Sequence, residues 1–533
     1  MAYPSFEQYN NAFSAHQQLL FDPELRSGAV AKTGLGTPLA ISGGFALTYT
    51  IKSGAKKYAV RCFHRESIAL ERRYLAIARR LVQLRSPYFL DFEFQPKGIR
   101  VDGNAYPIVK MAWAQGVTLG EFLEDNHGNK VALMRLSASL LALSTFLEKE
   151  RVAHGDIQPG NMMVSGAGAI QLIDYDGMFV EDIRDLGSSE LGHINFQHPD
   201  RKAKNPFGPS MDRFSLIALS LAIKALNEDP ALWGKTNSEI DAIVFRANDF
   251  VDPASSSAFS ELMRKPALAT HAQHFAAVCR APIEKTPSLE DFFDGRNIPA
   301  GVIQIGVKPQ EGRSKLRYMG VYDVIDATNY DLCLRRVGDK VEVIGRIVEV
   351  KLGKASNGKS YIFINFGPWQ GRIFKVLIWS DGLGAISKKP DTLWVGKWVS
   401  VVGLMNPPYT KRGYKYSHLS INVTANGQMT VISEAEAKFR LMPSVKASIT
   451  LSSNRDVLDE IKGQTSPSQI KQAPVTSNKG VLDDIRRAQS GSQSGPTQVR
   501  APSQSAKQPT HGYSYQQQPK KGFFGKIFDW IFK

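Results

Sequence analysis

The sequence predicts an α+β protein: a two-lobed domain of mixed structure, then a small all-β barrel, then a disordered C-terminal tail. Three observations predict it. The length of 533 residues allows two or three hydrophobic cores and is too great for one. Two regions show the apolar alternation of strands, and the first also contains leucines at helical spacing. From about residue 443 the chain is rich in Ser, Gln, Lys and Pro, a composition typical of disorder.

Positive charge is concentrated in the C-terminal half of the chain. The net charge is +16, yet residues 1–337 carry 38 basic and 37 acidic side chains, residues 338–432 carry 13 and 5, and residues 433–533 carry 15 and 8. This surplus indicates a polyanionic partner, nucleic acid or anionic lipid, for the later segments. The three cysteines are too few for a disulfide framework. With no N-terminal apolar signal and no long apolar run, a cytoplasmic protein is expected.

The first mixed region follows a lead-in over residues 1–33 and extends over residues 34–297. Gly43 and Gly44 form a turn between its first two strands, where the missing side chains would let the backbone approach a phosphate. Leucines at helical spacing predict a buried helix that ends just before the central motifs. The strands are expected at 38–41, 46–51, 58–63 and 106–113, and the helices at 67–84 and 131–150.

The chemistry lies in a His-Gly-Asp-Ile-Gln-Pro-Gly-Asn stretch and an Asp-Tyr-Asp-Gly stretch that follows it. Asp156 offers a carboxylate that can orient a hydroxyl and accept its proton. Asn161 and Asp174 offer oxygens, the ligands that Mg²⁺ prefers. The spacing places Asp156 and Asn161 on one tight loop. Apolar runs at 162–164 and 170–173 predict a hairpin that returns Asp174 to the side of Asn161.

The two motifs, in this order and a hairpin apart, resemble the catalytic loop and the metal-binding aspartate of the protein-kinase superfamily. The resemblance is to an atypical, bacterial-type serine/threonine kinase and covers residues 34–297. It implies a bilobal fold, ATP and Mg²⁺ as cofactors, and Ser or Thr hydroxyls of a protein as acceptors. Small-molecule kinases of the aminoglycoside-phosphotransferase type share the His-Gly-Asp motif, so the class of acceptor stays open.

The resemblance also assigns residues to the nucleotide. Arg61 stands where kinases carry the lysine that pairs with the phosphates, and its planar fork can grip phosphate oxygens. Glu71 is the expected carboxylate partner of Arg61, with Glu66 as the alternative. Backbone groups from Met111 to Trp113 would hydrogen-bond adenine.

The chain departs from the kinase pattern at several places. Gln158 replaces the lysine that steadies the γ-phosphate, and Asp176 displaces the usual glycine to Gly177. Asp212, by contrast, fits the resemblance: it is expected to cap its helix and to hydrogen-bond the catalytic-loop backbone. Together with Arg61, these departures keep a second reading open, a pseudokinase scaffold that recruits partners and binds nucleotide poorly or not at all.

After a linker at 298–337, five alternating strands and a short helix within residues 338–432 resemble an oligonucleotide-binding (OB) fold. Basic and aromatic residues interleave on these strands, as in proteins that track a phosphate backbone and stack bases, which implies single-stranded DNA or RNA as a partner. The alternative is a barrel that docks protein and keeps its aromatics in the core. The candidate nucleic-acid-binding residues are Lys359, Tyr361, Arg372, Lys411, Arg412, Tyr414 and Tyr416.

The tail, residues 433–533, is expected to be mostly disordered and to carry short interaction motifs. A similar apolar–acidic pattern occurs at 453–462 and 477–486, which predicts a protein partner bound twice as a helix in a groove. The aromatic and basic segment 520–533 would bind either a protein groove or an anionic membrane.

Overall fold

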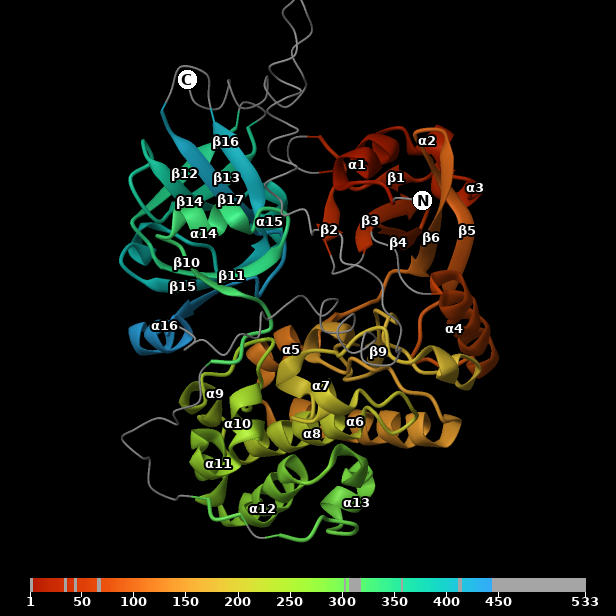
Figure 1. Cartoon of the computed structure of the whole chain (residues 1–533), viewed down its shortest axis with the longest axis vertical. Helices are drawn as coiled ribbons and strands as arrows, with labels where there is room; N and C mark the ends of the chain where they lie inside the picture. The colour runs from red at the N-terminus through yellow and green to blue at the C-terminus, as the bar shows by residue number, and fades with distance from the viewer. Residues whose placement is uncertain are drawn as a thin grey trace, which may run out of the picture.

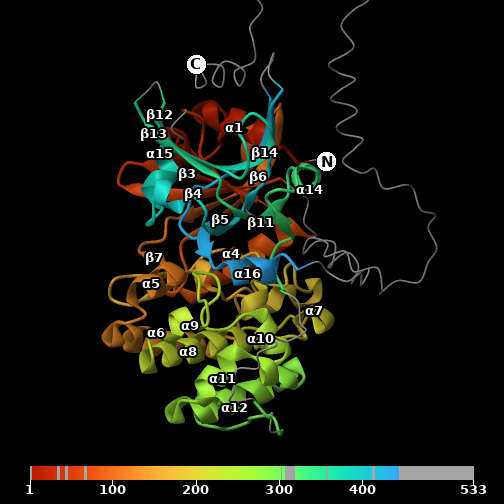
Figure 2. The same ribbon diagram turned by 90° about the vertical axis from the view of Figure 1, so that its left-hand side faces the viewer.

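The chain forms an N-terminal lobe (residues 3–112), a helical lobe (113–305) and a β-domain (318–442). In Figure 1 the N-terminal lobe and the β-domain lie side by side above the helical lobe. Figure 2, turned by 90°, shows the β-domain in front of the N-terminal lobe, again above the helices. The computed structural model describes residues 3–32, 36–42, 46–64, 69–301, 303–305, 318–355, 358–410 and 415–442.

A six-stranded sheet forms the N-terminal lobe, with strand order β1-β3-β4-β6-β5 and with β2 paired to β3. On β4, Tyr58, Val60 and Cys62 are buried in one core. Because side chains alternate along a strand, Arg61 points to the opposite face of the sheet. The strands are β1 Ala29–Val30, β2 Ala40–Ser42, β3 Ala46–Ser53, β4 Lys56–Phe63, β5 Phe92–Val101 and β6 Asn104–Ala112, and helix α4, Leu70–Leu84, follows β4.

The segment predicted as a lead-in is part of this lobe. It forms helices α1 Phe6–Ser14, α2 His16–Leu19 and α3 Pro23–Ser27. The ring of Phe13 stacks on that of Tyr49 with 3.8 Å between centroids. The buried Tyr9 hydroxyl donates to the carbonyl oxygen of Phe63 at 2.7 Å. These aromatic side chains attach the first helices to the sheet, so the lobe begins well before residue 34.

The helical lobe is built around α6 and α8, whose apolar faces share one core with the short sheet β7-β8-β9. Helix α6 is long and apolar enough to cross a membrane by composition, but its leucines at helical spacing pack into this core. The helices are α5 Leu119–Asn126, α6 Lys130–Glu150, α7 Arg201–Lys204, α8 Arg213–Glu228, α9 Leu232–Lys235, α10 Ala247–Val251, α11 Ser257–Met263, α12 Pro266–Arg280 and α13 Leu289–Phe293; the strands are β7 Val117–Thr118, β8 Met162–Val164 and β9 Ile170–Leu172.

The β-domain consists of a four-stranded sheet, β10-β11-β15-β18, and a five-stranded sheet, β12-β13-β14-β17-β16, around one core. Within the second sheet β14 and β17 run parallel. Its elements are β10 Val324–Asp326, α14 Tyr330–Arg335, β11 Lys340–Arg346, β12 Glu349–Lys354, β13 Ser360–Asn365, β14 Arg372–Ile378, α15 Ser380–Ala385, β15 Trp398–Leu404, β16 Asn406–Thr410, β17 Ser417–Asn422, β18 Met429–Ile432 and α16 Glu434–Arg440. Short 3₁₀ turns occur at Pro159–Asn161, Glu181–Leu186, Ile194–Phe196, Pro253–Ser255, Ile283–Lys285 and Thr392–Trp394.

Two expectations for this part need correction. The strand predicted at 341–350 is divided between the sheets, because the Ile347 amide bonds to the carbonyl of Lys397 whereas the next amide, of Val348, bonds to that of Asn365. The described strands therefore form two sheets and not one closed barrel. The predicted linker also contributes structure, since β10 pairs in parallel with β11 and α14 packs nearby.

Several predicted sites lie outside the described residues. They are Gly43 and Gly44, the alternative carboxylate Glu66, the loop residues Lys411, Arg412 and Tyr414, and the tail segments 453–462, 477–486 and 520–533.

Candidate functional site

The loop that contains Asp156 connects α6 to β8 and is fixed by a carboxylate of the helical lobe. Asp212, at the start of α8, accepts hydrogen bonds from the backbone amides of His154 and Gly155, the second at 2.8 Å. Its side chain makes no helix-capping bond. The predicted contact with the loop backbone is therefore confirmed, and the predicted capping is not observed.

The backbone conformation and close packing at position 155 explain why this loop carries glycine where many kinases carry arginine. Its φ is +84°, and a Cβ atom there would lie 2.2 Å from the carbonyl oxygen of Gly177. Both the conformation and the close approach exclude a side chain. The His-Gly-Asp motif thus reflects direct packing of the loop against the segment that follows Asp174.

Asp156 is held by three donors. Its carboxylate accepts hydrogen bonds from the Gln158 amide at 2.6 Å, the Asn161 amide at 2.8 Å and the backbone N–H of His193 at 2.6 Å. The residue is only 9% exposed. Gly192 permits the last bond, because a Cβ atom there would come within 3.0 Å of the Asp156 carboxylate. A carboxylate oriented this firmly is suited to accepting a proton from one direction.

Asn161 and Asp174 are brought together as the spacing predicts. The backbone N–H of Ile173 donates to the carbonyl of Asn161 at 3.0 Å, which joins the two ends of the hairpin. The Asn161 amide nitrogen is engaged with Asp156, which leaves its side-chain oxygen outside these bonds. Asp174 has a φ of +63°, in the left-handed region that few residues other than glycine adopt and that aspartate tolerates better than most.

Arg61 crosses from the N-terminal lobe and contacts two carboxylates of the helical lobe. Its Nη1 donates to Asp174 at 2.5 Å, and its Nη2 pairs with Asp176. The Arg61 side chain is 14% exposed, and that of Asp176 is 6% exposed. Among the described residues, the buried Nε of Arg61 has no hydrogen-bond partner. This guanidinium therefore holds an unused donor beside two aspartates.

The two aspartates differ in their electrostatics. Burial raises the pKa of Asp176 to about 6, with a further rise from the neighbouring Asp174, although Arg61 opposes both. Burial also disfavours the charge of Asp174, yet the Arg61 guanidinium holds the pKa of that carboxyl below its usual range. The difference marks Asp174 as the better-stabilised anion of the two.

The predicted pairing of Arg61 with Glu71 is not observed. Glu71 is exposed in the first turn of α4, and the described residues contain no ion pair between it and Arg61. Helix α4 instead directs Tyr74 into the site, where its hydroxyl donates to Asp176. Helical periodicity predicts the helix but does not decide which polar side chain of α4 reaches Arg61. Sequence reasoning therefore missed both Tyr74 and the role of Asp176 as a partner.

The expected adenine-binding segment lies at the end of β6. Met111 is inside the strand, opposite Ala59 on β4 and Phe92 on β5. The Trp113 amide donates to the carbonyl of Lys57 at 2.9 Å, so this donor is already used within the lobe. The adenine contact expected of backbone groups from Met111 to Trp113 stays a prediction, and in this conformation the Trp113 N–H is not free to make it.

Two of the predicted nucleic-acid-binding aromatics, Tyr361 and Tyr416, are packed and not exposed. Tyr361 is 7% exposed and stacks on Phe363 with 4.4 Å between centroids. Tyr416 is 5% exposed and stacks on His418 at 4.6 Å. The alternation along the strands predicts that these rings share a face, but not that the face is covered.

The two described basic candidates on the same domain, Lys359 and Arg372, lie in more open positions. Lys359 is exposed just before β13. Arg372 pairs with Asp331 at 2.6 Å and lies over the ring of Tyr330. Lys375, which sequence reasoning did not select, is buried, and burial lowers its pKa to about 8.

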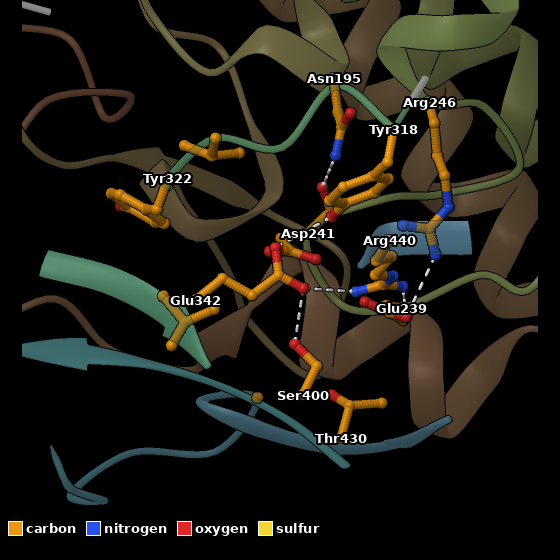
Figure 3. A pocket seen from close by; sticks show the side chains of 13 residues that line it. Asn195, Glu239, Asp241, Arg246, Tyr318, Tyr322, Glu342, Ser400, Thr430 and Arg440 are labelled. Carbon is orange, nitrogen blue, oxygen red and sulfur yellow. Dashed lines mark hydrogen bonds and ion pairs between the residues drawn. The ribbon is translucent and has the colours of Figure 1, made fainter. Parts of the chain in front are cut away.

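A buried ionic cluster joins the β-domain to the helical lobe (Figure 3). Arg440 of α16 is 2% exposed and contacts Glu342 at 2.9 Å, Glu436 at 2.8 Å and, across the interface, Glu239. Arg246 of the helical lobe also pairs with Glu239, at 3.1 Å. The cluster borders a cavity of about 20 Å³, enough for a water molecule.

The same interface lies close to the loop that contains Asp156. Asn195, which lines the cavity, is two residues from His193, whose backbone N–H bonds to Asp156. Burial lowers the pKa of His193 to about 4, and Lys340 of the β-domain contributes to the decrease. The β-domain therefore stands beside the Asp156 loop.

Comparisons with known proteins point to one kind of enzyme. The chain is 24% identical over 157 residues to the serine/threonine-protein kinase Nek3 of Oryza sativa subsp. japonica, over 28% of this chain and 26% of that protein. It is 21% identical over 181 residues to the MAP kinase kinase MKK1/SSP32 of Saccharomyces cerevisiae, over 33% of this chain and 35% of the relative. With the human serine/threonine-protein kinase greatwall the identity is 23% over 199 residues, or 36% and 22% of the two chains.

The chain thus spans about a quarter to a third of the length of these curated relatives. No family model matches it. These similarities are distant and partial, and each of the relatives named here is a protein kinase. They support placement of this chain in a protein-kinase-like superfamily.

Proposed function

We propose that the protein is an atypical Mg·ATP-dependent serine/threonine protein kinase. The observation that carries the proposal is the convergence of Asp156, Asn161, Asp174 and Arg61 from two lobes onto one site. The names of the similar proteins, all protein kinases, favour a protein hydroxyl over a small-molecule acceptor.

The residues present fit the cofactors of such a reaction. The buried Nε of Arg61 lacks an acceptor among the described residues, and a phosphate oxygen would supply one. Asn161 and Asp174 offer oxygen ligands, and Mg²⁺ in nucleotide sites is commonly held by one or two protein oxygens together with phosphates. Within the described ranges no group of three or more His, Cys, Asp or Glu could hold a metal alone.

Each side chain then has a defined task. Asp156 accepts the proton of the attacking hydroxyl, and its three donors fix the direction of that transfer. Arg61 neutralises phosphate charge. Asn161 and Asp174 would hold Mg²⁺. Bound Mg·ATP supplies the transferable phosphoryl group and a cation that balances its charge.

Replacing Asp156 by Asn is expected to slow turnover by about 100-fold or more while nucleotide binding stays near that of the wild type. The amide keeps the size of the carboxylate but cannot accept the proton. The measurement is transfer of label from γ-labelled ATP to protein, alongside the shift in unfolding temperature with Mg·ATP. An Asp156→Asn variant as active as the wild type would show that the site is misplaced.

The alternative is a pseudokinase scaffold that uses its lobes to recruit partners. Its supporting observation is Arg61 itself, which pairs with Asp174 and so occupies a carboxylate that a metal would need. The two proposals differ in nucleotide binding. Stabilisation of the wild-type protein by Mg·ATP favours the kinase, and no stabilisation favours the scaffold.

A second proposed activity is binding of single-stranded nucleic acid by the β-domain as an OB-type module. Five strands in a sheet with one parallel pair, and helix α15 after β14, agree with a partly open five-stranded barrel. Residues 338–432 carry 13 basic and 5 acidic side chains, so the segment attracts polyanions.

The full-length protein is then expected to bind single-stranded DNA with an affinity that falls as salt rises, because bound lysines and arginines release condensed counterions. Replacing Lys359 and Arg372 by Ala should weaken binding and lower the slope of log affinity against log salt by about one per lost phosphate contact. Lys438→Ala, on α16, is the matched control. Binding that ignores salt would assign the β-domain to protein docking.

A further inference from the structure

We propose that Asp176, fixed by the Tyr74 hydroxyl, is the carboxylate that positions Arg61 for a nucleotide phosphate. The inference rests on the proposed function, since it concerns the same site. It assigns the partner of Arg61 to the segment that carries Asp174, and not to the exposed Glu71 of helix α4.

Both oxygens of Asp176 are used. Oδ1 accepts the hydrogen bond of the Tyr74 hydroxyl, and Oδ2 accepts that of Arg61 Nη2. The Ser189 hydroxyl donates to the Asp176 carbonyl at 2.5 Å, which fixes the backbone as well. With its side chain 6% exposed, this carboxylate has one orientation available and little access to water.

Tyr74 is itself held rigidly. It is 4% exposed, and its ring packs against Phe63, Phe92 and Phe94 at centroid distances of 5.1, 6.0 and 5.6 Å. The hydroxyl therefore reaches Asp176 from a fixed point in the core of the N-terminal lobe. Helix α4 contributes a neutral donor to the site, and the negative charge comes from the helical lobe.

The two carboxylates that contact Arg61 are suited to different tasks. The Asp174 side chain is 40% exposed, which leaves it accessible to a ligand, whereas Asp176 is enclosed. Arg61 bonds Asp174 through Nη1 and Asp176 through Nη2, so it can lose the first partner and keep the second. Nη1 would then be available to donate to a phosphate oxygen while Nη2 stays on Asp176.

The test compares four full-length variants. Asp176→Asn removes the charge, Tyr74→Phe removes only the hydroxyl, and Glu71→Gln changes the partner expected from sequence. Asp185→Asn is the matched control, because Asp185 forms an exposed pair with Arg72 of the same helix, at 2.6 Å. Each variant is assayed for the Kd of Mg·ATP, for KM and kcat, and for unfolding by urea.

Asp176→Asn is expected to raise the Kd and KM for ATP by about 10- to 100-fold, the range for loss of a charge-assisted hydrogen bond, with a smaller change in kcat. Tyr74→Phe should shift the same constants in the same direction by less. Glu71→Gln and Asp185→Asn should stay within about twofold of the wild type. A loss of ATP affinity in Glu71→Gln that equals or exceeds that in Asp176→Asn would overturn the proposal.

A double-mutant cycle separates this inference from the proposed function. In the absence of nucleotide, Arg61→Ala and Asp176→Asn should be non-additive by at least about fivefold in the unfolding equilibrium, as contacting residues are, whereas Arg61→Ala and Glu71→Gln should be additive. If the wild-type protein binds no nucleotide, the kinase proposal is contradicted. The double-mutant cycle still decides whether Arg61 pairs with Asp176. Additivity of Arg61 with Asp176 overturns the inference even in an active kinase.

Discussion

Asp174→Asn is expected to reduce phosphoryl transfer by at least about 100- to 1000-fold, the scale for removing one preorganised electrostatic group from an active site. The amide is a poor replacement for a carboxylate that must balance the charge of a cation. Asp174 also accepts a 2.5 Å bond from Arg61, so the substitution weakens the fixation of the phosphate-binding guanidinium. The measurement is the rate of γ-label transfer to protein at saturating Mg·ATP.

The control for this prediction is again Asp185→Asn, which removes an exposed carboxylate from the Arg72 pair away from the site. It should retain wild-type transfer. If Asp174→Asn transfers label at the wild-type rate in protein of wild-type stability, the assignment of Asp174 to the metal is wrong.

Arg440→Ala is expected to lower the free energy of unfolding by about 3–5 kcal/mol, the range for leaving buried charges without their partner. Arg440 contacts Glu239, Glu342 and Glu436. The carboxylates of Glu342 and Glu436 are 4% and 7% exposed, so water cannot replace the guanidinium there. Urea titration followed by tryptophan fluorescence measures the change.

Lys438→Ala provides the comparison on the same helix. Lys438 pairs with Glu434 at 2.6 Å, but both side chains are more than half exposed, so no measurable shift of the midpoint is expected. Adding Glu342→Gln to Arg440→Ala should restore part of the lost stability, because it removes one of the uncompensated charges. Equal midpoints for Arg440→Ala and Lys438→Ala would contradict a stabilising role for the cluster.

The local features of the site could be predicted from the sequence. The interval from Asp156 to Asn161 fits one turn, and the apolar runs that follow form the hairpin β8–β9 that returns Asp174. Both predictions depend on residues close together in the chain. Short-range spacing and strand periodicity determine such contacts, whatever the rest of the fold does.

Contacts between distant elements could not be predicted. The choice between Glu71 and Asp176 as partner of Arg61 depends on how α4 docks against the sheet. A helical pattern predicts which residues share a face of the helix, but it does not predict which other element packs against that face. For the same reason, alternation placed Tyr361 with Phe363 on one face of the β-domain, while their burial emerged only from the packing. The sequence shows the i,i+4 spacing of Glu436 and Arg440 but not the contact of Arg440 with Glu239, which lies 201 residues away.

The Arg440 cluster also bears on which fragments of this protein keep their native contacts. A fragment that stopped at the end of the helical lobe would keep Glu239 and its partner Arg246 but lose Arg440, the second arginine that pairs with Glu239. It would also uncover Ile240, against which Gly427 packs so closely that a Cβ atom there would lie 1.7 Å away. The helical lobe and the β-domain are therefore expected to unfold together, and a fragment meant to keep the Asp156 loop in these surroundings needs α16.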